Sequence, residues 1–221
     1  MLILLKRLLS YVMPFTRTVQ STISGPLEVT WYQSRKVLDT RHANYSYGSL
    51  QRILRYGLLF VAPERASHTL LLGLGGGSVV ATLRQELQYQ GYLTAVELDP
   101  VMIELADTEF NIRPDAQLEI VCADAFEWVH TAPAGHFGLI IVDLFVDLTL
   151  PSGLQTIRFW QELRRVLRPN GYVLFNTLTE VPLYVANEEL PTYLESVGFA
   201  VKTLEVERLN QLLVLQKEDD V

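Results

Sequence analysis

The feature that most constrains the fold is an apolar run that ends in a glycine-rich turn. Leu70-Leu71-Leu72 leads into Gly73-Leu74-Gly75-Gly76-Gly77-Ser78. Glycines permit positive φ and let the backbone approach a ligand closely, and a helix that starts there offers free N–H groups. Dinucleotide folds use the spacing G-x-G-x-x-G. Here Gly73, Gly75 and Gly77 give G-x-G-x-G, so the pattern indicates a nucleotide-binding turn, with a plain tight turn as the alternative.

After residue 66 apolar runs alternate with helical stretches. The expected strands are Thr69–Gly73, Tyr92–Leu98, Leu118–Ala123, Leu139–Asp143 and Tyr172–Asn176, and the expected helices span about 78–90, 100–110, 124–131 and 155–168. Nearly continuous Leu/Ile/Val runs are typical of parallel strands that are buried on both faces. Val201–Arg208 and Leu212–Lys217 follow as two β runs with a short turn near Asn210, which predicts an antiparallel hairpin. The predicted fold class is therefore α/β, a seven-stranded doubly wound Rossmann-like sheet with an antiparallel C-terminal hairpin.

The first 65 residues have a different pattern. Residues 27–40 read as a β-hairpin around Gln33-Ser34-Arg35. Residues 48–61 read as a helix that places Leu50, Ile53, Leu54, Leu58 and Val61 on one face. Leu2–Met13 predicts a short amphipathic helix that packs on the body or on a partner, with a membrane-surface anchor as the alternative. We expect two parts, 1–65 with the N-terminal helix, hairpin and entry helix, and 66–221 as the nucleotide-binding core.

Charge and composition exclude several classes of protein. The formal net charge of −7 divides into +6 for residues 1–65 and −13 for residues 66–221. The acidic majority argues against a nucleic-acid binder, and no run reaches the ~18 uncharged apolar residues of a membrane span. Cys122 is the one cysteine, which excludes a disulfide framework and a cysteine-based zinc site and fits a reducing, cytoplasmic compartment. No metal site is expected. A basic front on an acidic core suggests electrostatic contact between subunits.

Acidic residues end three of the predicted strands. Glu97 lies 20 residues after Gly77, where a carboxylate accepts both hydroxyls of a ribose; a solvated loop acid is the alternative. Asp124 is placed to accept from an adenine amino group, to cap the next helix, or both. Asp143 lies next to the switch point at which open α/β sheets bind ligands, and Asp147 gives a weaker signal. Asn176, at the end of the fifth strand, is a weak candidate for the pocket lining.

Together the G-x-G-x-G turn, Glu97, Asp124, Asp143, the Leu-x-Pro-x-Gly turn at residues 167–171 and the terminal hairpin resemble the class I S-adenosylmethionine-dependent methyltransferases over about residues 66–217. Within that superfamily the chain is most similar to the spermidine synthase branch, which has a small N-terminal β domain. The resemblance implies S-adenosylmethionine, or its decarboxylated form, as cofactor. It implies a small-molecule acceptor and a homodimer formed through the N-terminal region. The cofactor-binding residues that it implies are Gly73, Gly75, Gly77, Glu97, Leu98, Asp124, Ala125 and Asp143, and the catalytic ones are Asp143, Asp147 and Tyr47.

The chain departs from the polyamine synthases in its acceptor site. Their motif after strand four is D-S/T-S/T-D-P, and here Asp143 fits the first Asp while Asp147 lies one residue too far along. The Asp of their glycine turn falls on Gly76, and the His-Glu after their tyrosine becomes Gly48-Ser49. Most amine-binding acids are therefore missing. Methyl transfer to a small molecule is the leading hypothesis, with aminopropyl transfer or a catalytically inactive nucleoside-binding or scaffold protein as alternatives.

Overall fold

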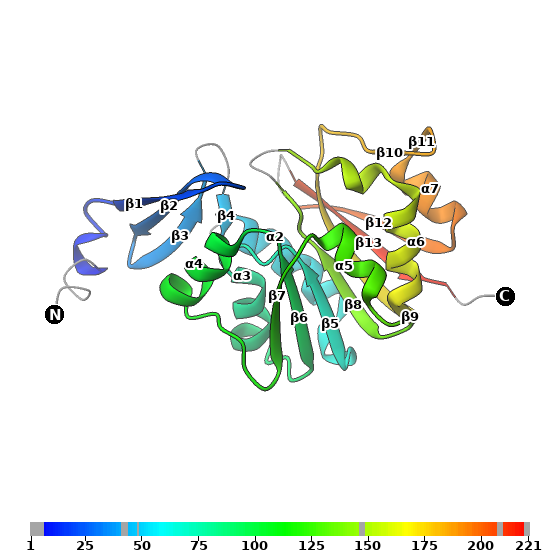
Figure 1. The fold of residues 1–221 in the computed structure, drawn as a ribbon, viewed down its shortest axis with the longest axis horizontal. Coiled ribbons are helices and arrows are strands. Elements are labelled where there is room, and N and C mark those ends of the chain that lie inside the picture. The colour runs from blue at the N-terminus through cyan, green and yellow to red at the C-terminus, as the bar shows by residue number, and fades with distance from the viewer. Residues whose placement is uncertain (1–6, 41–43, 48, 146–148, 207–209, 219–221) are drawn as a thin grey trace.

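A computed structural model describes residues 7–40, 44–47, 49–145, 149–206 and 210–218. Its core is a seven-stranded sheet with helices on both faces (Figure 1). The strand order is β12-β13-β9-β8-β5-β6-β7. These strands are β5 (His68–Leu72), β6 (Tyr92–Glu97), β7 (Leu118–Cys122), β8 (Phe137–Val142), β9 (Leu167–Leu178), β12 (Phe199–Glu205) and β13 (Asn210–Lys217).

The directions of the strands confirm the predicted fold class. The neighbouring pairs among β5 to β9 are all parallel. β13 lies between β9 and β12 and is antiparallel to both. The chain therefore forms a seven-stranded Rossmann-like sheet with an antiparallel C-terminal hairpin, as the apolar runs predict.

Two helical layers explain why the central strand β5 is apolar on both of its faces. Leu70 and Leu72 of β5 pack into one core with α5, α6 and α7, whereas Leu71 packs into the other with α2 and α3. Successive side chains of a strand point to opposite faces, so both faces of β5 are buried. The helices are α2 (Ser49–Val61), α3 (Ser78–Ala81), α4 (Pro100–Phe110), α5 (Ala125–Thr131), α6 (Ile157–Val166) and α7 (Leu190–Ser196).

The helix expected over 78–90 ends early. After α3 the backbone forms a π turn over Thr82–Glu86, and Gln88 takes a positive φ of 54°. This path returns Tyr89 to the sheet, where its hydroxyl accepts a 2.9 Å hydrogen bond from Thr69 Oγ1. Burial of Tyr89 thus overrides the helical periodicity.

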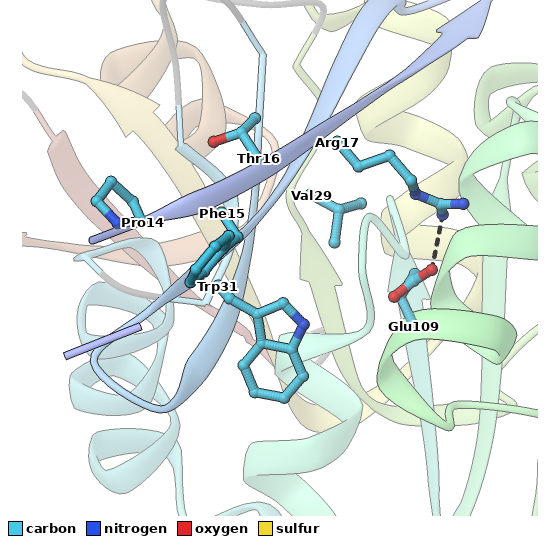
Figure 2. Close-up of a pocket in the computed structure, with 7 residues that line it drawn as sticks. All are labelled: Pro14, Phe15, Thr16, Arg17, Val29, Trp31 and Glu109. Carbon is cyan, nitrogen blue, oxygen red and sulfur yellow. Dashed lines mark hydrogen bonds and ion pairs between the residues drawn. The ribbon is translucent and has the colours of Figure 1, made fainter. Parts of the chain in front are cut away.

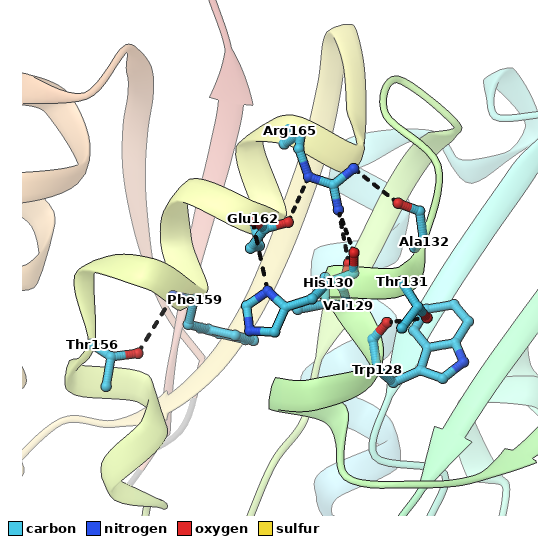
Figure 3. A network of polar contacts seen from close by, with 9 residues as sticks. All are labelled: Trp128, Val129, His130, Thr131, Ala132, Thr156, Phe159, Glu162 and Arg165. Atoms are coloured by element: carbon cyan, nitrogen blue, oxygen red, sulfur yellow. Dashed lines mark hydrogen bonds and ion pairs between the residues drawn. The ribbon is translucent and has the colours of Figure 1, made fainter.

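An arginine holds α5 against α6 (Figure 3). The guanidinium of Arg165 donates to the carbonyl oxygens of Val129, His130 and Ala132 at 2.9–3.3 Å, and it pairs with Glu162. These carbonyls end α5, where a cation also complements the helix dipole. The position of α5, and of the strand end from which it starts, is fixed in this way.

The N-terminal residues form a four-stranded antiparallel sheet in the order β1-β2-β3-β4. The strands are β1 (Phe15–Ser21), β2 (Gly25–Tyr32), β3 (Arg35–Asp39) and β4 (Asn44–Ser46). The predicted hairpin is β2–β3, and φ values of 48° and 66° at Gln33 and Ser34 suit a type I′ turn. Sequence reasoning missed β1 and β4. Leu27, Val29 and Leu38 pack on Met102 and Leu105 of α4, so this sheet is seated on the core.

The two predicted N-terminal helices differ in how they pack. α2 forms as predicted, and Ile53, Leu54, Leu58 and Val61 are buried against the large sheet, while the side chain of Leu50 lies outside the described part. The predicted boundary at residue 65 stays a prediction. Although α2 precedes that boundary in the sequence, it packs with the core. Of the expected helix over 2–13, residues 7–13 are described; residues 7–9 are helical, and residues 10–13 form a turn and a bend, so the helix ends earlier than expected. Among the described residues no helix is long and apolar enough to cross a membrane.

Short elements complete the described chain. The sequence predicted none of them, because each has too few residues to show a period. They are the 3₁₀ turns Pro63–Arg65 and Ser152–Gln155 and the two-residue strands β10 (Tyr184–Val185) and β11 (Glu188–Glu189).

Candidate active site at the carboxyl edge of the sheet

The glycine turn lies directly against the end of β8. Gly73 N donates to Val96 O, and Asp143 N donates to Leu72 O, both at 2.9 Å. Gly73 has φ +94°, and a β-carbon there would overlap the carbonyl oxygen of Asp143. Only glycine satisfies both the backbone angle and the close approach. The turn and the strand-end aspartate are therefore brought together as predicted.

Glu97 binds the glycine turn. Its Oε2 accepts from the backbone N–H groups of Leu74 and Gly75, each at 3.0 Å, and its Oε1 accepts from Asp99 N at 3.0 Å. Burial raises the pKa of Glu97, and these backbone hydrogen bonds oppose that rise. Glu97 is thus not a solvated loop acid. It shapes the turn and leaves one lone pair of Oε1 for a ligand hydroxyl.

Asp124 caps α5 at the end of the next strand. Its Oδ1 accepts from Phe126 N at 2.7 Å, and the side chain is exposed. Ala125 is buried below it, whereas Leu98 is 46% exposed at the end of β6. Leu98 and Asp124 follow the ends of the paired strands β6 and β7. An exposed leucine can contact the face of a flat ring, and an exposed carboxylate can accept from its edge. The predicted cap is present, and the predicted adenine contact stays a prediction.

Asp143 is a partly buried acid with an amide partner. Its Oδ1 accepts from Asn176 Nδ2 at 2.9 Å. Burial raises the pKa of Asp143 to about 6, with the nearby charge of Glu97 adding to the rise and the hydrogen bond from Asn176 opposing it. A carboxylate with such a pKa can accept a proton near neutral pH.

The short strand β4 covers the glycine turn. Ser78 N, at the start of α3, donates to the buried Ser46 Oγ at 3.2 Å. A β-carbon on Gly76 would lie 2.9 Å from Ser46 Cβ and 3.2 Å from Leu38 Cδ2. Gly76 therefore admits the N-terminal sheet at the position where the resemblance implies an aspartate.

Asp99 joins the same sheet to the core. It is buried, it caps α4 through Val101 N at 2.9 Å, and its Oδ2 accepts from the hydroxyls of Ser21 and Ser24 at 2.5 and 2.6 Å. Sequence reasoning missed this role. An Asp-Pro pair is typical of a helix start, and it carries no signal for a contact with residues about 75 positions earlier.

The other two predicted catalytic residues are not brought to Asp143 by any described contact. Tyr47 has φ +69°, and its ring stacks on Phe110 with centroids 4.6 Å apart. Burial raises the pKa of Tyr47 above its usual value. Asp147 lies outside the described residues. Their catalytic roles stay predictions.

The sheet order, the glycine turn and the strand-end acids define a class I methyltransferase-like fold. Residues 70–175 match the family model described as a methyltransferase domain. The polyamine aminopropyltransferase of Vibrio vulnificus (strain CMCP6) is 32% identical over 150 residues, which cover 66% of this chain and 48% of that protein. The chain thus spans about half of the length of that relative.

Solved structures show the same fold. Human methyltransferase-like protein 13 in complex with SAH has a TM-score of 0.60 at 22% identity, and the match covers 78% of this chain and 83% of that one. Spermidine synthase from Thermotoga maritima has a TM-score of 0.61 at 19% identity, and the match covers 92% of this chain and 73% of that one. The chain therefore has the class I methyltransferase fold. In sequence it is similar to polyamine aminopropyltransferases.

Proposed function

We propose that the chain is an S-adenosylmethionine-dependent transferase that moves a methyl group to a small-molecule acceptor. The observation that carries the proposal is the glycine turn held between Glu97 and the end of β8, beside Asp143. Glu97 Oε1 would accept one ribose hydroxyl, and Leu98 and Asp124 would contact the adenine. The fit rests on the exposed Leu98 and Asp124 and on a turn that only glycine can form there.

The chemistry is an in-line displacement at carbon. S-adenosylmethionine supplies a methyl group bonded to a positively charged sulfur. The acceptor's lone pair forms the new bond to that carbon, the carbon–sulfur electrons stay with sulfur, and the acceptor's proton passes to the Asp143 carboxylate. The chain's main task is to hold donor and acceptor aligned with water excluded, with Asp143 as the base.

Aminopropyl transfer from decarboxylated S-adenosylmethionine is the second candidate. One observation favours it: the T. maritima spermidine synthase matches 92% of this chain, against 78% for the human methyltransferase-like protein. The absence of most amine-binding acids from the sequence argues against it. A catalytically inactive nucleoside-binding protein is the third possibility.

Calorimetry with S-adenosylmethionine and with its decarboxylated form tests the proposal. We expect micromolar binding that falls at least tenfold in Glu97→Gln, because the amide can still accept from the turn but offers N–H groups where a ribose hydroxyl needs an acceptor. Glu127→Gln, an exposed acid in the first turn of α5, is the control and should bind normally. No binding of either compound would overturn the proposal. Turnover of putrescine with the decarboxylated donor would favour the second candidate, and binding without turnover across an acceptor panel the third.

We also propose a homodimer formed through the N-terminal region. β1 is an edge strand of its sheet, and unpaired edges are pairing sites. Beside it lies a pocket of about 570 Å³ lined by residues that include Phe15, Trp31 and Glu109 (Figure 2), and Leu8 and Val12 are 64% and 89% exposed.

A cytoplasmic location is part of the proposal, since Cys122 is a free, exposed thiol and suits a reducing compartment.

Sedimentation tests the dimer. We expect Val12→Glu to shift the chain to monomer, whereas Val181→Glu, an exposed valine after β9, leaves the assembly unchanged. A native monomer, or equal effects of the two variants, would contradict this interface.

A further inference from the structure

Three polar side chains from three adjacent strands form a chain of hydrogen bonds at the carboxyl edge. Asn176 Nδ2 donates to Asp143 Oδ1 at 2.9 Å. Asn210 Nδ2 in turn donates to Asn176 Oδ1 at 3.2 Å. Asp143 follows β8, Asn176 lies in β9 and Asn210 begins β13, so the chain of bonds crosses from the parallel part of the sheet to its antiparallel hairpin.

Burial dictates how the middle amide is oriented. Asn176 is 0% exposed, and a buried amide needs partners for both its oxygen and its nitrogen. An ionised carboxylate only accepts hydrogen bonds, so the nitrogen of Asn176 must face Asp143. Its oxygen must then meet a donor, and Asn210 supplies one. Turning the Asn176 amide over would set oxygen against oxygen at Asp143 and nitrogen against nitrogen at Asn210.

This chain of hydrogen bonds from Asn210 through Asn176 to Asp143, called the amide relay below, gives the two oxygens of Asp143 different surroundings. Oδ1 is occupied by Asn176, whereas none of the described residues donates a hydrogen bond to Oδ2. We propose that Asn176 and Asn210 are positioning residues that lock the Asp143 carboxylate, so that Oδ2 is the atom that takes the acceptor's proton. This inference deepens the proposed function and rests on it for the identity of the proton donor.

Among the described residues, Glu97 is the charged group that acts on Asp143. From β6 the carboxylate of Glu97 acts on it by like charge. The neighbouring strands β5 and β9 contribute the neutral groups Gly73 and Asn176. The state of Asp143 is thus governed by Glu97, by burial and by the amide relay, and a change in the relay should be measurable against that background.

Asn210→Asp is the sharpest test, because it keeps the shape of the side chain and removes its N–H donors. The Asn176 nitrogen would then turn to the new carboxylate and leave its oxygen facing Asp143. We expect the pKa of Asp143, followed by the ¹³Cγ NMR resonance of the labelled side chain, to rise at least one unit above its wild-type value. That is a tenfold higher proton affinity. The uncharged variant Asn210→Ala should give a smaller rise, at least threefold in proton affinity.

Gln211→Glu is the matched control. It adds the same charge one residue along β13, where the side chain points to the opposite face of the sheet, and it should change the proton affinity of Asp143 less than twofold. Equal shifts in Asn210→Asp and Gln211→Glu, or no shift in Asn210→Ala, would overturn the relay. The titration needs neither donor nor acceptor. The relay can therefore fail while S-adenosylmethionine still binds, and calorimetry can fail while the relay stands.

Discussion

The space that a β-carbon on Gly73 would need is filled by the carbonyl oxygen of Asp143. The glycine turn and the candidate base are thus a single packed unit, and there is no space between them for one methyl group. Changes at either residue should be felt at the other.

Gly73→Ala should therefore destabilise the fold by far more than backbone strain alone. Gly25 is a matched control, since its φ of +73° resembles the +94° of Gly73 but nothing lies within 4 Å of its missing β-carbon. We expect about 1 kcal/mol of lost stability for Gly25→Ala from positive φ, and on the order of 3 kcal/mol for Gly73→Ala from strain and overlap together. Urea unfolding measures both. Similar losses would show that the overlap is relieved by small shifts.

Asp143→Asn should stabilise the fold near neutral pH. Burial raises the pKa of Asp143 from 3.8 to about 6 in the folded state, so the folded protein binds this proton more tightly than the unfolded one. Above the folded pKa the buried carboxylate is ionised and lowers the free energy of unfolding by the full amount. Below the unfolded pKa it is protonated in both states, and this loss of stability disappears. At about 1.4 kcal/mol per pKa unit, the variant should gain up to about 3 kcal/mol at alkaline pH. Unfolding at several pH values should show that gain shrinking between about pH 6 and pH 4, and a gain independent of pH would contradict the cause.

Gly76→Asp, which restores the residue implied by the resemblance, should push β4 away from the turn. Its β-carbon would lie 2.9 Å from Ser46 Cβ, which is overpacking with a typical cost of about 2 kcal/mol. Ser46→Gly in the same chain should recover part of that loss although it also removes the hydrogen bond to Ser78 N. A double-mutant cycle by urea unfolding measures the coupling, and additive losses would mean that the two residues do not compete for the same space.

Asp99→Asn should loosen the N-terminal sheet. The amide keeps an oxygen for Val101 N but cannot accept from both Ser21 and Ser24, which now donate to the same carboxylate oxygen. Hydrogen exchange should speed up in β1 and β2 and stay unchanged in β5 and β8. Thr18→Ala, an exposed residue of β1, is the control. Faster exchange throughout the chain would indicate global destabilisation instead.

The sequence predicted the large sheet and the positions of the acids that end its strands, because parallel strands buried on both faces leave apolar runs and place their carboxyl ends together. Glu97, Asp124 and Asp143 follow from that rule alone. The roles of Ser46 and Asn210 do not, since each depends on a contact between segments that are far apart in the chain. β1 was missed because Phe15 and Val19 are only partly buried and the rest of the strand is largely exposed, which leaves no alternation of apolar residues to detect.

The basic excess of residues 1–65 is used in part within the chain. Arg17 and Lys36 both pair with Glu109 of α4, at 2.6 and 2.8 Å, and Arg55 pairs with Glu86 at 2.7 Å. Complementary charge therefore helps to seat the N-terminal sheet on the core. The sequence showed the difference in net charge between the two parts, but only the structure shows which acids pair with the basic residues.

The position of β13 also constrains the order of folding. β13 lies between β9 and β12 although it follows both in the sequence. It is antiparallel to both, so β9 and β12 run in the same direction and direct pairing between them would exclude β13. The native sheet needs β13 to add to β9, alone or as the β12–β13 hairpin, and that step delivers Asn210 to Asn176.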